Sequence, residues 1–223
     1  MDIQSIALPV SSSIGNVSAE YFIPEKSSCI ITLAHGAGAG MHHSFMVTLA
    51  QSLADFGIAT LRFNFPFMEQ KKKRPDVPAV AHKTVEAAIA NAHERFPSIP
   101  LFVSGKSFGG RMSSQFLSAH SISYVRGIIF YGFPLHQIGA PSMERAEHLK
   151  QVKHPMLFLQ GTRDELAKFD LIESVCASLP LATLIKIEGA NHAFKAGKQN
   201  IMQVLVDNTR QWVEKLNNQS ELL

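Results

Sequence analysis

The sequence has few cysteines, few charged residues and no long apolar run. Its two cysteines among 223 residues show no metal-ligand spacing and no disulfide framework, which excludes the small secreted proteins that disulfides hold together. Charged residues make up 17% of the chain and apolar residues 46%, a balance typical of a folded protein and not of a disordered one. We expect both thiols, Cys29 and Cys176, to be reduced and buried.

The usual signals of export and of membrane insertion are also missing. The first residues, Met1 to Ser5, do not form a basic segment followed by an apolar core. No apolar run approaches the roughly 18 residues that span a bilayer. We therefore expect a cytoplasmic protein without membrane contact.

Positive charge is concentrated in one short run. The formal net charge is +3, and Lys71–Arg74 supplies four adjacent basic residues between Gln70 and Pro75. Nucleic-acid-binding segments usually combine such charge with aromatic side chains, and this run has none. We interpret it as a solvated loop and expect no nucleic-acid partner.

Short β-branched segments alternate with longer segments of helical period along the chain. We expect strands near residues 3–9, 17–23, 29–34, 58–63, 101–104, 125–131, 156–160 and 184–187, and helices near 44–56, 80–96, 108–120, 141–151, 167–178 and 198–217. This alternation is typical of a mostly parallel sheet with helices on both faces. The prediction is one α/β domain over residues 1–223, with an eight-stranded sheet whose first two strands form a hairpin at one edge.

The interval between Tyr131 and His154 limits what can stand over the sheet. It is long enough for a loop and one helix and too short for a separate cap domain. We therefore expect no cap domain and an open site above the strand ends.

The pentapeptide Gly105-Lys106-Ser107-Phe108-Gly109 follows an expected strand and precedes an expected helix. In that context a G-x-S-x-G pattern is typical of a nucleophile elbow, where glycines allow close backbone approach and the serine hydroxyl projects from the sheet. N–H groups at the start of the helix also favour the negative charge that develops on a substrate. We predict that Ser107 is a nucleophile.

A phosphate-binding loop is the alternative interpretation, because Gly105-Lys106-Ser107 also has the G-K-S ending of a P-loop. That pattern requires a glycine five positions before Gly105, where this chain has Pro100. The segment is also too short to wrap a phosphate, so the P-loop interpretation is disfavoured.

Two further polar residues follow strands in the order that serine chemistry requires. Asp164 follows the strand expected at 156–160, and His192 follows the strand expected at 184–187. Because the carboxyl ends of parallel strands meet at one edge of a sheet, both side chains should lie near Ser107. The sequence predicts a Ser-His-Asp triad in which Glu165 remains an alternative acid.

A run of small residues, His35–Gly40, follows the strand expected at 29–34. Small residues let main-chain N–H groups approach a substrate oxygen, so we expect the N–H groups of Ala37 and Phe108 to form an oxyanion hole. A dinucleotide-binding loop is the alternative, but its G-x-G-x-x-G pattern would need glycine where the chain has Met41.

At these residues the chain resembles the α/β-hydrolase superfamily over nearly its whole length. Its segments HGAGAG at 35–40, LRFNFPFME at 61–69 and GKSFGGR at 105–111 are similar to those of small lidless serine hydrolases. These include dienelactone-hydrolase-like proteins and the testis-expressed and NSL-complex hydrolase-like proteins. The resemblance implies a compact α/β-hydrolase fold without a lid and the same triad, and it implies no particular substrate.

Several charged motif residues have two interpretations. Arg62, Asn64 and Glu69 flank the turn after a strand, where they either bind a polar substrate group or join that loop to its neighbours. We favour the structural interpretation. Arg111 either attracts an anionic substrate together with Lys106 or pairs with Glu69 as a buried bridge.

The same edge supplies candidate substrate-binding residues, namely His35, Gly36, His42 and Lys106. His42 and His43 are placed to line the mouth of the site. As a pair they lack a third ligand, so we expect no metal, and no motif indicates a cofactor.

These expectations combine into one reaction. We expect a carboxylesterase-like enzyme that hydrolyses a small carboxylic ester or thioester through an acyl-enzyme intermediate. A small peptide would use the same machinery. A non-catalytic binding or scaffold module on the same fold remains the alternative from another class, and the oligomeric state stays open.

Overall fold

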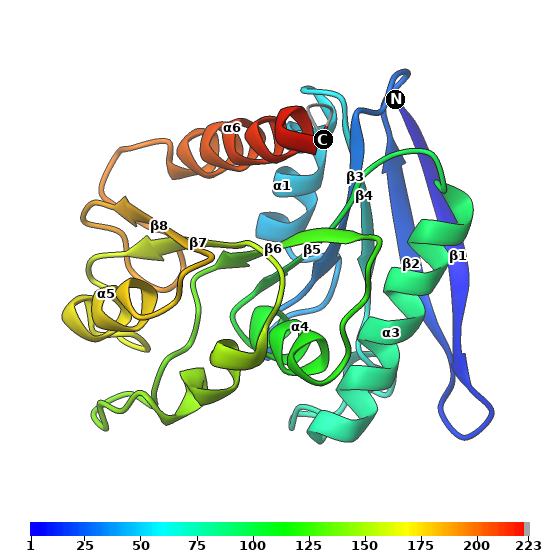
Figure 1. The fold of residues 1–223 in the computed structure, drawn as a ribbon. Helices are drawn as coiled ribbons and strands as arrows, with labels where there is room; N and C mark the ends of the chain where they lie inside the picture. The colour runs from blue at the N-terminus through cyan, green and yellow to red at the C-terminus, as the bar shows by residue number, and fades with distance from the viewer. Residues whose placement is uncertain (221–223) are drawn as a thin grey trace.

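The computed structural model describes residues 1–220 and shows one sheet between two layers of helices (Figure 1). The strands are β1 (Asp2–Ser11), β2 (Gly15–Ile23), β3 (Cys29–Ala34), β4 (Ile58–Phe63), β5 (Leu101–Lys106), β6 (Val125–Tyr131), β7 (Met156–Gly161) and β8 (Ala182–Ile187). The helices are α1 (Ser44–Ala54), α2 (Pro66–Glu69), α3 (Pro78–Arg95), α4 (Phe108–Ala119), α5 (Phe169–Ala177) and α6 (Ile201–Ser220), and η1 (Glu144–Gln151) is a 3₁₀ helix. The domain predicted for residues 1–223 extends into residues 221–223, which lie outside the described residues.

The eight strands are ordered β1-β2-β4-β3-β5-β6-β7-β8. From β4 to β8 all neighbouring strands are parallel, whereas β2 is antiparallel to both β1 and β4. The mostly parallel eight-stranded sheet, with its hairpin at one edge, is therefore confirmed. Its parallel part brings the carboxyl ends of β3, β5, β7 and β8 to the same edge.

The burial of each strand follows from its place in the sheet. All six residues of β3, of β4 and of β7 are buried, because helices cover both faces there. The edge strand β1 instead alternates between exposed and partly buried positions along much of its length. Mostly apolar runs in the sequence thus mark interior strands of the sheet.

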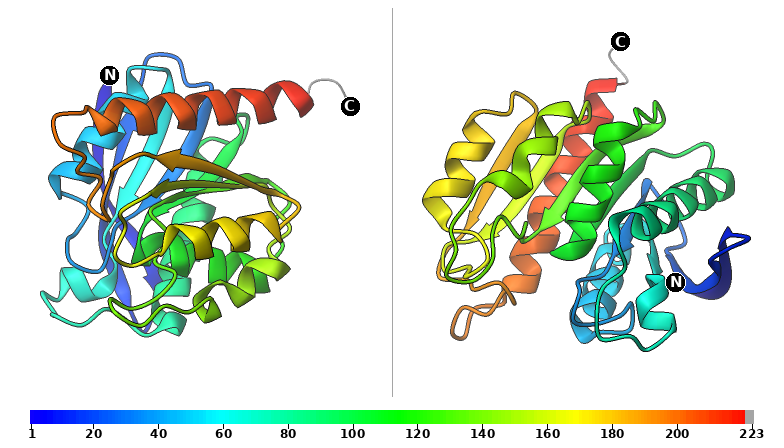
Figure 2. Two further views of the ribbon diagram at one scale, coloured as in Figure 1. Left: turned by 90° about the vertical axis from the view of Figure 1, so that its left-hand side faces the viewer. Right: turned by 90° about the horizontal axis from the view of Figure 1, so that it is seen from below.

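Helices pack on both faces of the sheet (Figure 2). On one face, Leu49 and Leu53 of α1 pack in the same apolar cluster as Leu205 and Trp212 of α6. The other face is covered by α3, α4, η1 and α5, whose buried residues include Ile89, Met112, Leu149 and Ile172. Both apolar layers are built from side chains at helical spacing, as the sequence pattern predicted.

Two helical segments differ from the expectation. The helix expected at 141–151 is the 3₁₀ helix η1, and its buried residues Ala146 and Leu149 are three positions apart, as three residues per turn require. The short helix α2 was not expected, and it begins with Pro66 at its first position.

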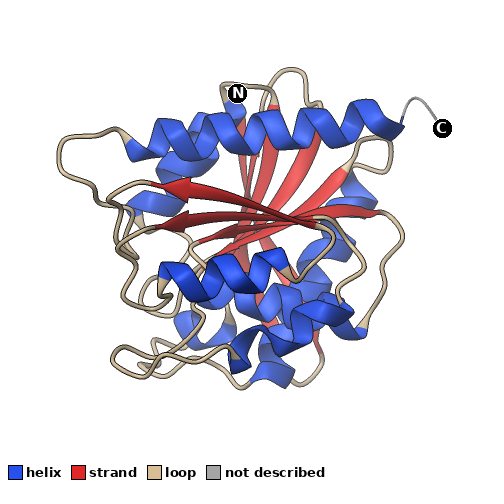
Figure 3. Ribbon diagram, turned by 60° about the vertical axis from the view of Figure 1, so that its left-hand side comes forward, coloured by secondary structure: helices blue, strands red, loops and turns tan. Residues whose placement is uncertain are grey.

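The segment between β6 and β7 holds a loop and η1, so within the described residues no cap domain covers the strand ends. Figure 3 shows that loops gather where the arrows of β7 and β8 end. The edge where β3, β5, β7 and β8 end is therefore open to ligands.

In residues 1–220 no helix has the length and apolar character needed to cross a bilayer.

Candidate active site

Ser107 lies at the sharp turn between β5 and α4. Its backbone has φ 50° and ψ −114°, a left-handed conformation that is uncommon for a residue with a side chain. The turn is possible because its flanking glycines are in very close contact with other backbone. A Cβ on Gly105 would lie 2.3 Å from the Gly110 nitrogen, and one on Gly109 would lie 2.4 Å from the Ala34 oxygen. The glycines hold Ser107 at the elbow that the sequence predicts.

The loops after β7 and β8 bring Asp164 and His192 to Ser107. His192 Nε2 lies 2.8 Å from Ser107 Oγ, and His192 Nδ1 lies 2.8 Å from Asp164 Oδ2 and 3.0 Å from Oδ1. The Asp164 side chain is 1% exposed and the His192 side chain 15%. Three residues separated by as many as 85 positions therefore form one hydrogen-bonded chain.

Gln160, the penultimate residue of β7, holds the buried carboxylate in place. Its Nε2 donates to Asp164 Oδ2 at 2.7 Å, and its Oε1 accepts from the Phe133 N–H at 2.8 Å. The other carboxylate oxygen accepts from the Leu166 N–H at 2.8 Å. Both oxygens thus have donors besides His192, which fixes the carboxylate against the imidazole.

These contacts determine which way a proton can move. A carboxylate next to Nδ1 requires that Nδ1 carry the hydrogen, so Nε2 is left to accept from the Ser107 hydroxyl. Glu165, the alternative acid, contacts a different atom, since its Oε2 accepts from the backbone N–H of His192 at 3.3 Å. The structure brings Asp164 to the imidazole ring and Glu165 to the backbone.

A pocket of about 430 Å³ opens beside Ser107. Its lining is mostly apolar and comes from the loops after β3, β7 and β8, from the end of β5 with the elbow, and from the start of α1. The lining residues are Gly36, Ala37, Gly38, Ala39, His43, Phe45, Met46, Lys106, Ser107, Leu166, His192 and Ala193. The pocket therefore places a small ligand directly against the serine hydroxyl and the imidazole.

The two residues predicted for an oxyanion hole lie on either side of Ser107. Ala37 is exposed and lines the pocket, and the adjacent Gly36 approaches the elbow so closely that a Cβ there would lie 3.7 Å from Ser107 Cβ. Phe108 is the first residue of α4, so its N–H has no acceptor carbonyl within the helix. Both N–H groups thus belong to the segments that flank the nucleophile.

Two predicted substrate-binding histidines lie elsewhere. His35 is fully buried, its Nε2 accepts from the Phe65 N–H at 2.9 Å, and its Nδ1 is 2.7 Å from the Gly36 oxygen. Burial lowers the pKa of His35 to about 4. His42 is exposed and is not part of the pocket wall. The prediction that these two side chains line the site is wrong, because one is turned into the core and the other toward solvent.

The charged residues around the β4 turn form a structural network. Arg62 is 1% exposed, its Nη1 donates to the Met41 oxygen at 2.6 Å, and its Nη2 pairs with Glu20. The Asn64 amide donates to Glu69 at 2.7 Å. These residues join the loop to its neighbours, as the structural interpretation predicted.

Arg111 does not pair with Glu69. The Glu69 carboxylate instead accepts from the backbone N–H and the hydroxyl of Ser18, at 3.0 and 3.2 Å. Burial lowers the pKa of Arg111, and the nearby charge of Arg145 lowers it further. The buried-bridge interpretation of Arg111 is therefore wrong, since the acid already has other partners.

The sequence did not single out several residues that shape the pocket. His43 lines the pocket, as expected for the mouth of the site, whereas no motif in the sequence points to Phe45, Met46 or Leu166. His43 caps α1, and its Nδ1 accepts from the Phe45 N–H at 3.2 Å. Histidine is not among the residues that usually cap helices, so the sequence gives no signal for this cap.

The described residues contain no group of three or more His, Cys, Asp or Glu side chains placed to hold a metal ion. Cys29 and Cys176 are both buried and free, as expected. The Ser107, His192 and Asp164 side chains form the hydrogen-bonded array at the strand ends.

A relative from Mycobacterium tuberculosis strain H37Rv, named as a candidate phosphoribosyl transferase, is 26% identical over 200 residues. The match covers 87% of this chain and 42% of that protein, so the chain spans about two fifths of the relative's length.

Solved structures share the fold over nearly the whole chain. A serine hydrolase without a lid from Xanthomonas campestris is 20% identical, with a TM-score of 0.76 and coverage of 95% of each chain. The dienelactone hydrolase from Anabaena variabilis is 19% identical, with a TM-score of 0.74 and coverage of 96% of this chain and 99% of that one. At this level of identity the likeness shows the fold alone.

The sequence pattern of the family described as the alpha/beta hydrolase domain matches residues 27–219. This range contains every strand from β3 to β8 and all three members of the Ser107, His192 and Asp164 array. The chain therefore belongs to the alpha/beta hydrolase domain family.

Proposed function

We propose that this chain is a serine hydrolase that cleaves small carboxylic esters. The observation that carries the proposal is the continuous hydrogen-bonded chain from Ser107 Oγ through His192 to Asp164, with a pocket beside its serine end. Related folds without a lid, among them a protein described as a serine hydrolase, support the same class. Serine, histidine and aspartate in this arrangement activate a hydroxyl for attack on a carbonyl.

The reaction follows from the positions of the protons. His192 Nε2 takes the hydroxyl proton as Ser107 Oγ forms a bond to the ester carbonyl carbon, and Asp164 stabilises the resulting imidazolium. The imidazolium then gives its proton to the departing alcohol as the carbon–oxygen bond breaks. Water then attacks the acyl carbon while His192 Nε2 takes its proton, and the imidazolium returns that proton to Ser107 Oγ as the bond from the acyl carbon to Oγ breaks and the carboxylic acid leaves.

The N–H groups of Ala37 and Phe108 are the proposed donors to the negative oxygen of the tetrahedral intermediate. Each belongs to a segment that touches the elbow, and the Phe108 N–H lies at the positive end of the α4 dipole. Fixed donors of this kind stabilise charge that develops only in the transition state.

The pocket favours a short acyl group. Its volume of about 430 Å³ lies near the lower end of the ~300–1,000 Å³ typical of small-molecule sites. Its apolar lining suits an alkyl or aryl ester, and the described residues provide no cap that would enclose a long chain. A thioester would use the same machinery.

Two free buried cysteines fit a reducing compartment such as the cytoplasm.

A fluorophosphonate probe tests the proposal. We expect wild-type protein to be labelled at one serine and Ser107→Ala to lose both labelling and hydrolysis of p-nitrophenyl acetate. Ser121→Ala, a change at an exposed serine after α4, is the matched control and should behave as wild type. Full labelling of the Ser107→Ala protein would refute the assignment, and absence of labelling in folded wild-type protein would favour a non-catalytic binding module.

A series of p-nitrophenyl esters from acetate to dodecanoate tests the substrate class. The specificity constant kcat/KM should be highest for the short esters and fall as the acyl chain outgrows the pocket. Matched acetyl thioester and small-peptide substrates show whether the preference is for esters. Higher kcat/KM for the dodecanoate would contradict the proposed substrate.

A further inference from the structure

The residues next to two members of the Ser107, His192 and Asp164 array both bind the backbone of the third. Lys106 precedes Ser107, and its Nζ donates to the His192 carbonyl oxygen at 2.6 Å. Glu165 follows Asp164, and its carboxylate accepts from the His192 N–H at 3.3 Å. His192 is thus held at both backbone polar groups, from the strand end that carries the nucleophile and from the loop that carries the acid.

The Lys106 side chain lies in closed surroundings. Its Nζ is 5.0 Å from the centre of the Phe194 ring and 6.0 Å from that of Phe45, and these two rings stack on each other. Besides these two rings, the backbone of Gly132 lies against the ammonium. Gly132 has φ 73°, and a Cβ there would lie 3.1 Å from Nζ. The ammonium therefore has one close carbonyl acceptor, His192 O, and two aromatic faces.

This location changes the predicted role of Lys106. The sequence suggested a substrate-binding cation, and the residue does line the pocket. The charged end, however, is already bonded to the His192 carbonyl and covered by Phe45 and Phe194. A substrate anion would have to displace a 2.6 Å hydrogen bond to reach it.

The charges around the ammonium come from two loops. Burial lowers the pKa of Lys106 to about 8, while the negative charges of Asp164 and Glu165, in the loop after β7, oppose that shift. The loop after β8 contributes the ionisable ring of His192, and α1 contributes the uncharged Phe45 together with its capping residue His43. At neutral pH a cation therefore stands beside the Asp164 and His192 pair.

We propose that Lys106 and Glu165 are positioning residues that clamp the His192 backbone and so hold its imidazole in line between Ser107 and Asp164. The inference rests on the proposed function. The clamp explains why a lysine, with its long stem and a cation at its end, occupies the position before the nucleophile. It acts through His192 and makes no contact with the reacting atoms.

Replacing the lysine should separate this role from simple packing. In Lys106→Met we expect kcat for p-nitrophenyl acetate to fall about 10- to 100-fold with little change in KM, because the base loses its alignment while the pocket wall is kept. A residue that only fills space would leave kcat unchanged in this variant, because methionine keeps a long unbranched side chain at the same place.

Two further substitutions test the hydrogen bond itself. Lys106→Arg and Lys106→Gln each keep a donor for the His192 carbonyl, so both should retain more kcat than Lys106→Met, with KM unchanged. Equal kcat in the Met, Arg and Gln variants would overturn the inference. If Lys106→Met does not fold, the Gln variant decides the question, and a change in KM with kcat at the wild-type value overturns the inference there.

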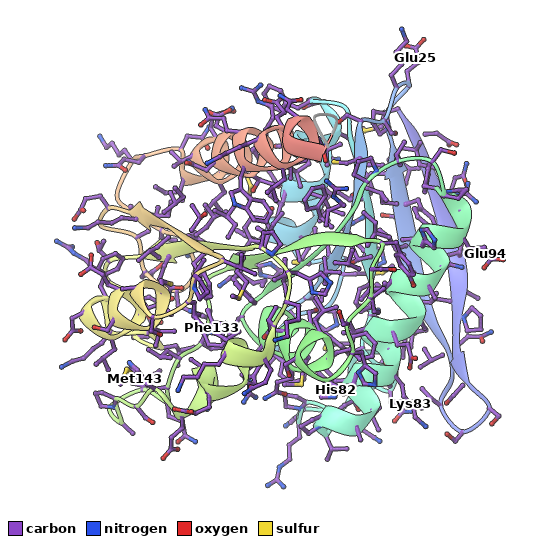
Figure 4. All side chains as sticks on the ribbon, viewed as in Figure 1. Glu25, His82, Lys83, Glu94, Phe133 and Met143 are labelled. Atoms are coloured by element: carbon purple, nitrogen blue, oxygen red, sulfur yellow. The ribbon has the colours of Figure 1, made fainter. Side chains whose placement is uncertain are left out.

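The acidic half of the clamp is tested in parallel. Glu165→Ala should lower kcat about threefold, and Glu165→Gln, which keeps a carbonyl acceptor for the His192 N–H, should retain more activity than the Ala variant. Lys83→Met and Glu25→Gln are matched controls at exposed positions, and Figure 4 shows Glu25 pointing away from the fold. Equal activity of the two Glu165 variants would remove Glu165 from the clamp.

The fluorophosphonate probe keeps two failures distinguishable. If wild-type protein is not labelled at Ser107, the proposed function itself fails. If wild-type protein is labelled and Lys106→Met matches it in labelling rate and kcat, the serine chemistry stands and the positioning role of Lys106 is overturned.

Discussion

Two histidines stand at equivalent places in the sheet and have opposite surroundings. His35 follows β3, and His192 lies in the loop after β8, so both lie at the carboxyl edge. His35 is fully buried, and both of its ring nitrogens face backbone groups, the Phe65 N–H and the Gly36 oxygen. The ring of His192 faces two side chains, Ser107 and Asp164, and remains 15% exposed.

The difference shows what makes a histidine chemically useful. Burial lowers the pKa of His35 to about 4, and the Gly36 oxygen and the charge of Glu69 oppose that shift only in part. His192 has Asp164 to stabilise a positive ring and an exchangeable hydroxyl proton on its other side. Both histidines lie at a strand end, so their different hydrogen-bond partners decide their different roles.

Among the substitutions that test this difference between His35 and His192, His192→Ala should have the largest effect. Loss of the base should lower kcat/KM for p-nitrophenyl acetate by about 10⁴-fold or more. The free energy of unfolding should change by less than about 1 kcal/mol, because the ring is partly exposed and its loss leaves little apolar surface uncovered. Urea unfolding and steady-state kinetics on the same preparation measure both, and retained turnover would contradict the proposed base.

His35→Ala should show the opposite pattern. It leaves the buried Phe65 N–H without its acceptor and removes a ring that packs 5.0 Å from the Phe65 ring and 5.5 Å from the Phe67 ring, measured between centres. We expect the free energy of unfolding to fall by about 3 kcal/mol and kcat/KM to fall less than tenfold at low temperature. An unchanged urea midpoint with lost activity would instead assign His35 a chemical role.

The neutral state of His35 also predicts a pH dependence of stability. Above the ordinary pKa of 6.5 the ring is neutral in the folded and unfolded chain, so it adds no pH dependence. Below that pH the unfolded chain binds a proton that the folded ring refuses until about pH 4, so the free energy of unfolding should fall by up to about 1.4 kcal/mol per pH unit.

His148 contributes in the same direction, since burial also lowers its pKa to about 4. Urea unfolding at steps between pH 7.5 and 4.5 measures the slope, and His148→Gln should make it shallower. A free energy of unfolding that stays constant between pH 6.5 and 5 would show that both rings accept protons in the folded chain.

The smallest expected effect concerns the neighbouring pair His42 and His43. Because His43 Nδ1 accepts from the Phe45 N–H, its Nε2 carries the hydrogen and is a donor at the pocket wall. His43→Asn keeps a helix-capping side chain and removes that donor, so KM for a substrate with a polar acyl group should rise about two- to fivefold with kcat unchanged. His42→Asn is the matched control, and an equal change in both variants would show no contact from His43.

Much of the fold was predictable because its pattern is local. The alternation of short β-branched runs with helical segments predicts every strand, and most helix ends lie within three residues of the expected ones. The elbow was predictable for the same reason, since Gly105, Ser107 and Gly109 are adjacent in the sequence and their context is a strand followed by a helix.

The finer parts of the site were not predictable, because they depend on contacts between distant loops. Nothing in the sequence indicates that Gln160 holds Asp164 or that the Lys106 ammonium bonds to the His192 carbonyl, 86 positions away. Likewise, His35, His42 and His43 lie in one short loop, and only the path of that loop turns one ring into the core, one to solvent and one to the pocket.

The crowded glycines of the elbow have a consequence for how substitutions in this chain are interpreted. Gly105 and Gly109 have no room for a methyl group, so any replacement there displaces β5, α4 or the end of β3. In a complete single-substitution screen these two positions would be as intolerant as Ser107, although neither offers a reacting atom. Loss of activity at the elbow therefore identifies catalytic residues only when folding is measured alongside it.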